Sequence, residues 1–475
     1  MKFKQLLFVA FIFVTFTSVL AANDAVGIEV KIPQLSERKI FLCYYFNGLI
    51  YKQDSLYLSP QGEGVFHNKE NYKEGIYLIV LNSNQYADFL LSDDQTLTIT
   101  ITDTTDVFKH TRISGAEQSE AFQSWIDYLN EKRDAREQIQ KQYQAFSEEE
   151  KEKNREQFQK QLDDLDEEVE QNQKNLIAHY KDQWVGRFFL GTQPVTTGPY
   201  PTPQTQEEFN KEFSYQKEHF FDNIDLQDRR FWRTNYFPLK VTEYMENQIE
   251  QHPDSLAAAA SRLVAKTMGD SITFQLMMNR LIDFSAKSKI MGMENIWAKL
   301  VEDYYHKGFV TWGDSTHHSN IEFEYNKLRY NRIGMTAYDM DLQDSTGKQM
   351  KLYDLNEKYT LLYFYEPSCG HCIKTTPEIY EKIYRKYAGK GLDVAAVCIS
   401  NDRQEWLNFV KQNHLEGAHW HNLWDPDRKS FFWHFYDTSA TPSVYVLDKD
   451  KIIVAKKIDP SALDIIFGDY PDDSK

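Results

Sequence analysis

The sequence predicts a multidomain protein with an N-terminal β-sandwich, a central all-α domain that includes a long helical hairpin, and a C-terminal α/β domain. Three observations predict this order. Short apolar runs between turn residues come first, apolar residues at helical spacing follow, and strands that alternate with helices come last. The expected boundaries are 23–115, 116–330 and 331–475. A chain of 475 residues is also too long for one hydrophobic core, which agrees with several domains.

Residues 1–22 have the layout of a secretory signal peptide. Lys2 and Lys4 precede an apolar run, and the small residues Ala21 and Ala22 close it. The alternative is an N-terminal membrane anchor, but the run is shorter than the roughly 20 residues that a spanning helix needs. We therefore expect cleavage, and a mature protein in the periplasm or cell envelope of a bacterium.

The segment 23–115 contains short runs of strand type separated by turn residues. The clearest runs lie at 27–32, 39–46, 75–81 and 96–102. Several short strands at this spacing are typical of a small antiparallel sandwich.

Apolar residues then recur at helical spacing over 116–330. Two polar stretches, 122–146 and 158–176, each carry one apolar stripe, and Ser147 with Glu150 forms an expected capping box between them. These stretches predict an antiparallel hairpin of two long helices. Shorter periodic segments follow, so the whole region is predicted to be all-helical.

The net charge and the number of cysteines disfavour several classes of function. The net charge of −17 argues against a nucleic-acid partner, because such binding rests on clustered Lys and Arg. Only four cysteines are present, so the chain is not a disulfide-stapled scaffold. Cys43 and Cys398 lie in apolar runs and are expected to be buried small hydrophobic residues. The remaining two, Cys369 and Cys372, form a C-x-x-C motif, which is the main functional signal.

Beyond residue 331 strands alternate with helices. The predicted strands lie at 359–365, 392–399, 442–447 and 452–458, and the predicted helices at 373–387 and 405–411.

The C-x-x-C motif falls between the carboxyl end of a strand and the first turn of a helix. Backbone N–H groups and the helix dipole favour an anion there, so the pKa of Cys369 is expected below the free value of ~8.5. Cys372 lies one turn further in, where it can attack a mixed disulfide formed at Cys369. We therefore predict Cys369 as the nucleophile and Cys372 as the resolving residue.

A lone C-x-x-C is also half of a zinc site, which needs two further Cys or His ligands. The nearest candidates, His419 and His421, lie in a Trp-rich segment that is expected to be a loop. The adjacent His317 and His318 are expected to be solvated on a polar linker at 313–320. We predict no metal and no other cofactor.

The motif and its surroundings resemble the thioredoxin superfamily. The resemblance rests on 364–372, on Pro377 and on Thr441-Pro442 before the next strand. More narrowly, 332–458 resembles the TlpA/ResA-type thiol-disulfide oxidoreductases of the bacterial envelope. The segments 423–428 and 436–442 are similar to a subgroup that carries a β-rich domain and a helical domain of unknown function in front.

The resemblance implies roles for individual residues. Cys369 and Cys372 match the redox pair, and Pro377 matches the proline that bends the active-site helix. Pro442 matches a cis-proline that faces the cysteines, and Thr441 before it offers its backbone to a substrate strand.

Two departures leave the proton acceptor of Cys372 open. Tyr363 stands where thioredoxin has a buried carboxylate, and Thr375 stands where the ResA type has a glutamate. Glu366 and Glu378 are the candidate acceptors. His371 between the cysteines is expected to favour the thiolate at Cys369 and to make the site less reducing than thioredoxin.

The expected function is a thiol-disulfide oxidoreductase that reduces or exchanges disulfides of envelope proteins. Its expected partners are a protein disulfide substrate and a membrane or envelope electron donor, while the sequence indicates no oligomeric state. Two alternatives stay open: a disulfide isomerase or oxidase, and an envelope binding or scaffold protein with a secondary redox site. A peroxidase is disfavoured because Glu366 replaces the threonine expected before a peroxidatic cysteine.

Overall fold

The computed structural model describes residues 26–195 and 197–468, so the predicted signal peptide lies outside the described residues. Packing divides the described chain into two compact units. One contains the residues up to Gln193 together with Arg230–Tyr236, and the other contains Pro194–Arg229 and the residues from Phe237 onward. Within the described residues, no helix combines the length and the apolar character needed to cross a membrane.

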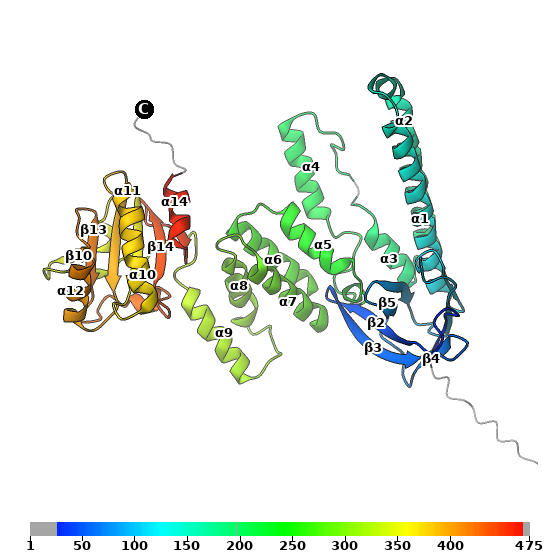
Figure 1. The fold of residues 1–475 in the computed structure, drawn as a ribbon, viewed down its shortest axis with the longest axis horizontal. Coiled ribbons are helices and arrows are strands. Elements are labelled where there is room, and N and C mark those ends of the chain that lie inside the picture. The colour runs from blue at the N-terminus through cyan, green and yellow to red at the C-terminus, as the bar shows by residue number, and fades with distance from the viewer. Residues whose placement is uncertain (1–25, 196, 469–475) are drawn as a thin grey trace, which may run out of the picture. The chain divides into compact units, whose positions relative to one another are not determined.

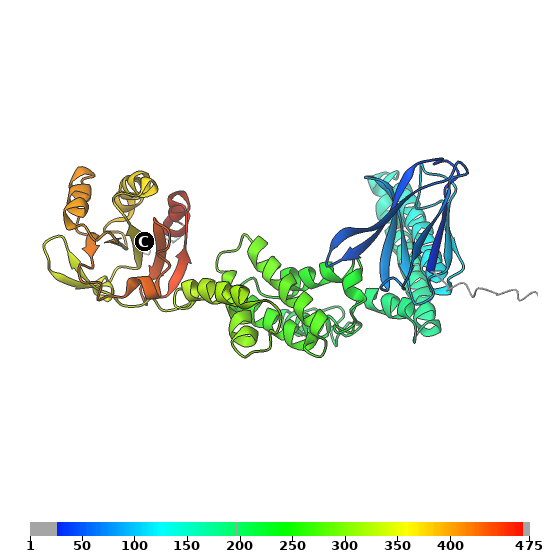
Figure 2. The ribbon, with the colours of Figure 1, turned by 90° about the horizontal axis from the view of Figure 1, so that it is seen from below.

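The first unit contains two four-stranded sheets, drawn in blue in Figure 2. Their orders are β4-β1-β7-β8 and β3-β2-β5-β6, and apolar side chains from both sheets share one core. The strands are β1 (Val26–Lys31), β2 (Lys39–Phe46), β3 (Leu49–Tyr57), β4 (Glu63–Asn68), β5 (Gly75–Asn82), β6 (Gln85–Leu91), β7 (Leu97–Ile101) and β8 (Thr111–Ser114).

The expectation of a purely antiparallel arrangement is wrong at one pair, because β1 and β7 are parallel, with Ile28 opposite Leu97. Five strands lie between them in sequence. A connection of that length can return the chain to the same end of the sheet, which a short hairpin cannot do.

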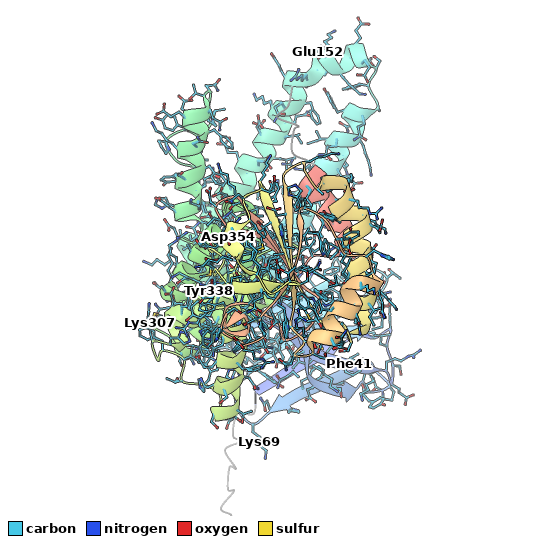
Figure 3. The ribbon with its side chains drawn as sticks, turned by 90° about the vertical axis from the view of Figure 1, so that its left-hand side faces the viewer. Phe41, Lys69, Glu152, Lys307, Tyr338 and Asp354 are labelled. Carbon is cyan, nitrogen blue, oxygen red and sulfur yellow. The ribbon has the colours of Figure 1, made fainter. Side chains whose placement is uncertain are left out.

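Three helices complete the first unit: α1 (Glu117–Gln144), α2 (Glu148–His179) and α3 (Trp184–Thr192), with a 3₁₀ turn η1 at Phe231–Arg233. Ser147 and Glu150 form the capping box that begins α2. Figure 1 shows α1 and α2 side by side, and Glu152 near their turn is labelled in Figure 3. The rings of Tyr143 and Phe158 stack between the helices with centroids 4.0 Å apart.

The predicted boundary at 116 does not coincide with the division by packing. Ser119 of α1 donates a hydrogen bond of 2.6 Å to the carbonyl of Leu90 in β6, and Gln118 accepts one from the backbone of Val185 at the start of α3. The long helices therefore pack with the strands, while the boundaries 23–115, 116–330 and 331–475 stay a prediction about independently folding segments.

The second unit begins with a helical region. Its elements are α4 (Gln206–His219), α5 (Phe237–Glu243), η2 (Tyr244–Gln248), α6 (Pro253–Thr267), α7 (Ser271–Lys287), α8 (Glu294–Leu300), η3 (Val301–Tyr305) and α9 (Ser315–Leu328). The linker predicted at 313–320 is wrong, since most of it is the first part of α9. The Asp314 carboxylate accepts a hydrogen bond of 2.8 Å from the backbone of His317 and so caps this helix.

The rest of the second unit is a seven-stranded sheet with helices on its faces. The sheet order is β10-β9-β13-β12-β11-β14-β15. The strands are β9 (Asp341–Asp344), β10 (Gln349–Lys351), β11 (Tyr359–Tyr365), β12 (Leu392–Cys398), β13 (Trp420–Trp424), β14 (Ser443–Asp448) and β15 (Ile453–Lys456). The helices are η4 (Leu352–Asp354), α10 (Gly370–Glu378), η5 (Ile379–Tyr384), α11 (Arg385–Tyr387), α12 (Arg403–Gln412), α13 (Phe432–Phe435) and α14 (Pro460–Gly468).

The three central strands β11, β12 and β13 are parallel, and β14 and β15 add antiparallel neighbours. Strands β11 and β12 are buried along their whole length, which is typical of parallel strands covered on both faces. The loop expected around His419 and His421 is wrong, because Trp420–Trp424 is β13. Its sequence, Trp-His-Asn-Leu-Trp, lacks the regular alternation of apolar and polar residues that indicates a strand, and its partner strands are distant in the sequence.

Candidate active site

The two cysteines of the C-x-x-C motif lie at the junction of β11 and α10. Strand β11 ends at Tyr365, and Cys369 is the residue that precedes the first helical turn. The backbone of Cys369 donates a hydrogen bond of 3.1 Å to the carbonyl of Glu366, which closes the turn. Cys369 is partly exposed, Cys372 is buried, and both are free thiols. The outer cysteine can therefore meet a protein substrate, and the inner one cannot.

A second loop faces Cys369 from across the site. The Thr441-Pro442 peptide bond is cis, as the resemblance implied. The Sγ atom of Cys369 donates a hydrogen bond of 3.3 Å to the carbonyl oxygen of Thr441. The loop before β14 and the start of α10 thus come together, although they are far apart in sequence.

The two thiols differ in acidity. The pKa of Cys369 is held below its ordinary value. Burial raises it, but hydrogen bonds from the Thr441 side chain and from the backbone N–H groups of Cys372 and His371 favour the thiolate and outweigh burial. Burial raises the pKa of Cys372 to about 11, although a backbone hydrogen bond from Glu366 opposes this rise. At neutral pH the exposed cysteine is the better nucleophile and the buried one holds its proton.

His371 acts on the thiolate through its backbone. Its side chain is exposed, and its imidazole has no hydrogen-bond partner among the described residues. Its backbone N–H, by contrast, is one of the donors that stabilise Cys369 as an anion. The imidazole effect expected from the sequence stays a prediction.

The candidate proton acceptors lie in different surroundings. Glu378 pairs with Lys382 at 2.6 Å on an exposed helix face. The backbone of Glu366 is hydrogen-bonded to Cys372, and its carboxyl stays a candidate acceptor. Tyr363 donates to or accepts from the Thr376 hydroxyl at 2.8 Å, and burial raises its pKa far above neutrality, so it is not a base. Sequence reasoning missed Thr376, which carries no signal apart from its place one turn after Cys372.

His419 and His421, the candidate zinc ligands, contact a carboxylate instead of the cysteines. The Nδ1 atom of His419 lies 3.0 Å, and the Nε2 atom of His421 3.3 Å, from one carboxylate oxygen of Asp393. Asp393 is at the amino end of β12, whereas the cysteines follow the carboxyl end of the parallel β11. Over the described ranges, no cluster of three or more His, Cys, Asp or Glu side chains could hold a metal ion. Cys43 and Cys398 are 7% and 1% exposed.

The C-terminal part of the chain is similar to known proteins. Residues 333–456 match the model of the AhpC/TSA family. The thiol-disulfide oxidoreductase ResA of Bacillus cereus is 30% identical over 130 residues, which is 27% of this chain and 70% of that protein. ResA of Bacillus subtilis is 26% identical over 137 residues, or 29% and 73% of the two chains. A thioredoxin-like protein from Bacteroides caccae has a solved structure with 18% identity and a TM-score of 0.42, covering 59% of this chain and 99% of its own.

The fold and the match together define a thioredoxin-like enzyme, a thiol-disulfide oxidoreductase that acts on protein disulfides. Through its C-terminal part, the chain belongs to the ResA family of these enzymes. The predicted thioredoxin-like fold of the C-terminal part is confirmed.

Proposed function

We propose that the chain reduces disulfides of proteins in the bacterial cell envelope through Cys369-Gly370-His371-Cys372. The opposite pKa shifts of the two thiols carry this proposal, because they separate an attacking group from a resolving group. The layout of residues 1–22 supports an extracytoplasmic location.

The reaction has two exchange steps. The Cys369 thiolate attacks one sulfur of the substrate disulfide, that S–S bond breaks, and the other substrate sulfur leaves as a thiolate. Cys372 then gives up its proton, for which Glu366 and Glu378 are the candidate acceptors, and attacks the sulfur of Cys369. The substrate leaves with both sulfurs reduced, and the enzyme keeps the disulfide. A membrane or envelope protein supplies the two electrons that restore the dithiol.

Substrate enters against the loop that ends in Pro442. The partly exposed Cys369 faces this loop, and the Thr441 carbonyl already accepts a hydrogen bond from its sulfur. A substrate strand that replaces this bond would lie along the same backbone, which is the role proposed for Thr441.

Trapping in the cell envelope tests the assignment. Cys372→Ser should accumulate covalent partners that dissolve with dithiothreitol, because the mixed disulfide at Cys369 cannot be resolved. Cys369→Ser, the matched control, should accumulate none. Equal trapping by both variants would overturn the assignment of the nucleophile.

A disulfide isomerase is the second candidate. The stabilised Cys369 thiolate favours it, because a good leaving thiolate lets substrate escape before the enzyme is oxidised. Refolding of scrambled ribonuclease distinguishes the two activities. A reductase consumes one dithiol for each disulfide lost, whereas an isomerase restores ribonuclease activity without net oxidation of the enzyme.

A further inference from the structure

The space in front of the cysteines is not bounded by the thioredoxin-like part alone. A cavity of about 630 Å³ is lined by His371, Thr375 and Pro442 on one side. Glu324 and Lys327 of α9 line its other side. The helical region of the same unit therefore forms one wall of the entrance to the redox site.

A second cavity of about 650 Å³ lies further along the same wall, between α7, α8 and α9. Its lining is largely apolar and includes Ile282, Ile290, Met291, Trp297 and Ile321. Ile290 and Met291 keep 40% and 42% of their surface exposed, so each still presents apolar surface to solvent. The volume is in the range of sites that hold a ligand side chain or small molecule.

The two cavities form one groove. Glu324, Lys327, Asp437 and Lys457 line both of them. These four charges are paired with each other: Lys327 with Glu324 at 2.8 Å, and Lys457 with Asp437 at 2.7 Å. Because these charges are already paired, this part of the groove offers little to an ionic ligand. The other end of the groove, around Ile290 and Met291, favours an apolar group.

The helical wall is fixed to the sheet by buried contacts. Lys456 of β15 is 5% exposed, and its Nζ atom lies 2.9 Å from a carboxylate oxygen of Glu294 in α8. The same Nζ donates to the carbonyl of Asn331 at 3.0 Å. Asn295 of α8 donates to the carbonyl of Ile333 at 3.2 Å. Since breaking a buried ion pair is strongly destabilising, these contacts keep the groove in place.

We propose that this groove binds the polypeptide of the disulfide substrate and that the cavity around Ile290 and Met291 takes an apolar side chain near the substrate cysteine. The enzyme then prefers cysteines with a large aliphatic neighbour at a fixed distance along the chain. This inference rests on the proposed function, since the groove is lined at one end by His371 of the C-x-x-C motif and by Pro442.

Mixed-disulfide formation with small probes tests the preference. Each probe is a glycine-rich peptide whose single cysteine is joined to 5-thio-2-nitrobenzoate. A leucine or a serine is placed one to four residues away on either side. In the full-length Cys372→Ser chain, the Cys369 thiolate attacks the peptide sulfur and releases one coloured thiolate for each bond exchanged. Cys43 and Cys398 are buried and do not compete.

The expected result is a leucine position at which the second-order rate exceeds that of the serine peptide about tenfold, or about 1.4 kcal/mol. That is slightly less than the gain from fully burying a leucine side chain, as expected for a cavity that leaves part of the side chain in contact with water. Ile290→Ser should reduce the leucine-to-serine ratio toward one. Ile272→Ser is the matched control, because Ile272 is 41% exposed, lies on α7 and lines neither cavity. Its ratio should equal that of the parent chain.

The outcomes separate the inference from the proposed function. A chain that attacks every probe but gives no leucine preference, or gives a preference that Ile290→Ser leaves intact, overturns the inference alone. A chain that attacks no probe, and does not react with the glycine-only peptide, overturns the proposed function and this inference with it.

Discussion

The two ends of the parallel strands in the second unit each gather titratable side chains, but their chemistry differs. At the carboxyl end of β11, Cys369 and Cys372 have separated acidities and one of them meets solvent. At the amino end of β12, His419 and His421 share the buried carboxylate of Asp393. At the carboxyl end, backbone N–H groups stabilise the thiolate of Cys369. At the amino end, two imidazoles contact the carboxylate of Asp393.

The difference shows that side-chain composition alone does not mark a reactive site. The carboxyl end is followed directly by a helix, whose first N–H groups point at the sulfur. At the amino end, two imidazole side chains contact the carboxylate of Asp393 instead. Four experiments test this difference between the two ends.

The largest difference should appear in catalysis. Cys369→Ser should lower the rate of insulin reduction by at least ~10³-fold, because the attacking sulfur is lost. Asp393→Asn should keep the rate within about twofold of the parent chain, because Asp393 lies at the other end of the strands. Turbidity of reduced insulin measures both variants. A large loss in Asp393→Asn with an intact fold would show that the two ends are coupled.

The stability of the fold, unlike catalysis, should depend on Asp393. Burial raises the pKa of Asp393, but hydrogen bonds from His421 and His419 outweigh it and lower the pKa overall. A carboxyl with a depressed folded pKa stabilises the fold above its unfolded value of about 3.9, and this stability is lost as pH falls through the folded value.

Asp393→Asn should therefore lower the opening free energy of β12 by about 1–3 kcal/mol at pH 7, and the deficit should shrink in acid. Hydrogen exchange of residues 392–398, followed by mass spectrometry, measures it. Asp427→Asn, at an exposed carboxyl, is the control. A deficit that grows as pH falls contradicts the assigned pKa direction.

Both ends of the parallel strands lie in the fragment 331–475, so the comparison can be repeated without the helical region that precedes it. We expect the fragment to fold and to reduce disulfides, with a stability loss of roughly 1–3 kcal/mol because Lys456 loses Glu294. Lys456→Met in the fragment should recover part of this loss. Urea unfolding measures both, and a fragment without a cooperative transition would refute the predicted boundary at 331.

The smallest effect concerns the redox potential. His371→Pro removes a backbone N–H that stabilises the Cys369 thiolate. The pKa of Cys369 should rise and the potential should fall by tens of millivolts, where about 30 mV equals 1.4 kcal/mol. His371→Ala keeps the N–H and tests the imidazole alone. Glutathione equilibration measures the potential, and a fall of equal size in His371→Ala would assign the effect to the side chain.

The reactive end was largely predictable from sequence, and the opposite end was not. Local order places Cys369 after a buried strand and at a helix start, which predicts the backbone N–H donors of His371 and Cys372, while the contact with Thr441 was implied only by the family resemblance. The contact of His419 and His421 with Asp393 depends on the pairing of β12 with β13, which are separated by a helix. No short-range pattern shows such pairing.

The same reasoning explains the other errors. The parallel β1–β7 pair joins segments about 70 residues apart, and the helical start at Ser315 depends on one capping carboxylate. Glu324 and Lys327 of α9 carry no sequence signal for the redox site, because they reach its entrance only through packing of the helical region.

The assignment of Arg230–Tyr236 to the first unit means that the backbone passes between the two units three times. Trp232 in this segment is fully buried, and its carbonyl accepts a hydrogen bond of 2.9 Å from the backbone of Asn47. A single protease cut after Gln193 would therefore separate the chain up to Gln193 from the rest but leave Arg230–Tyr236 of the first unit attached to the second unit. A product truncated there would lack the buried tryptophan that completes its own core. Removal of the whole first unit requires two further cuts, one on each side of Arg230–Tyr236.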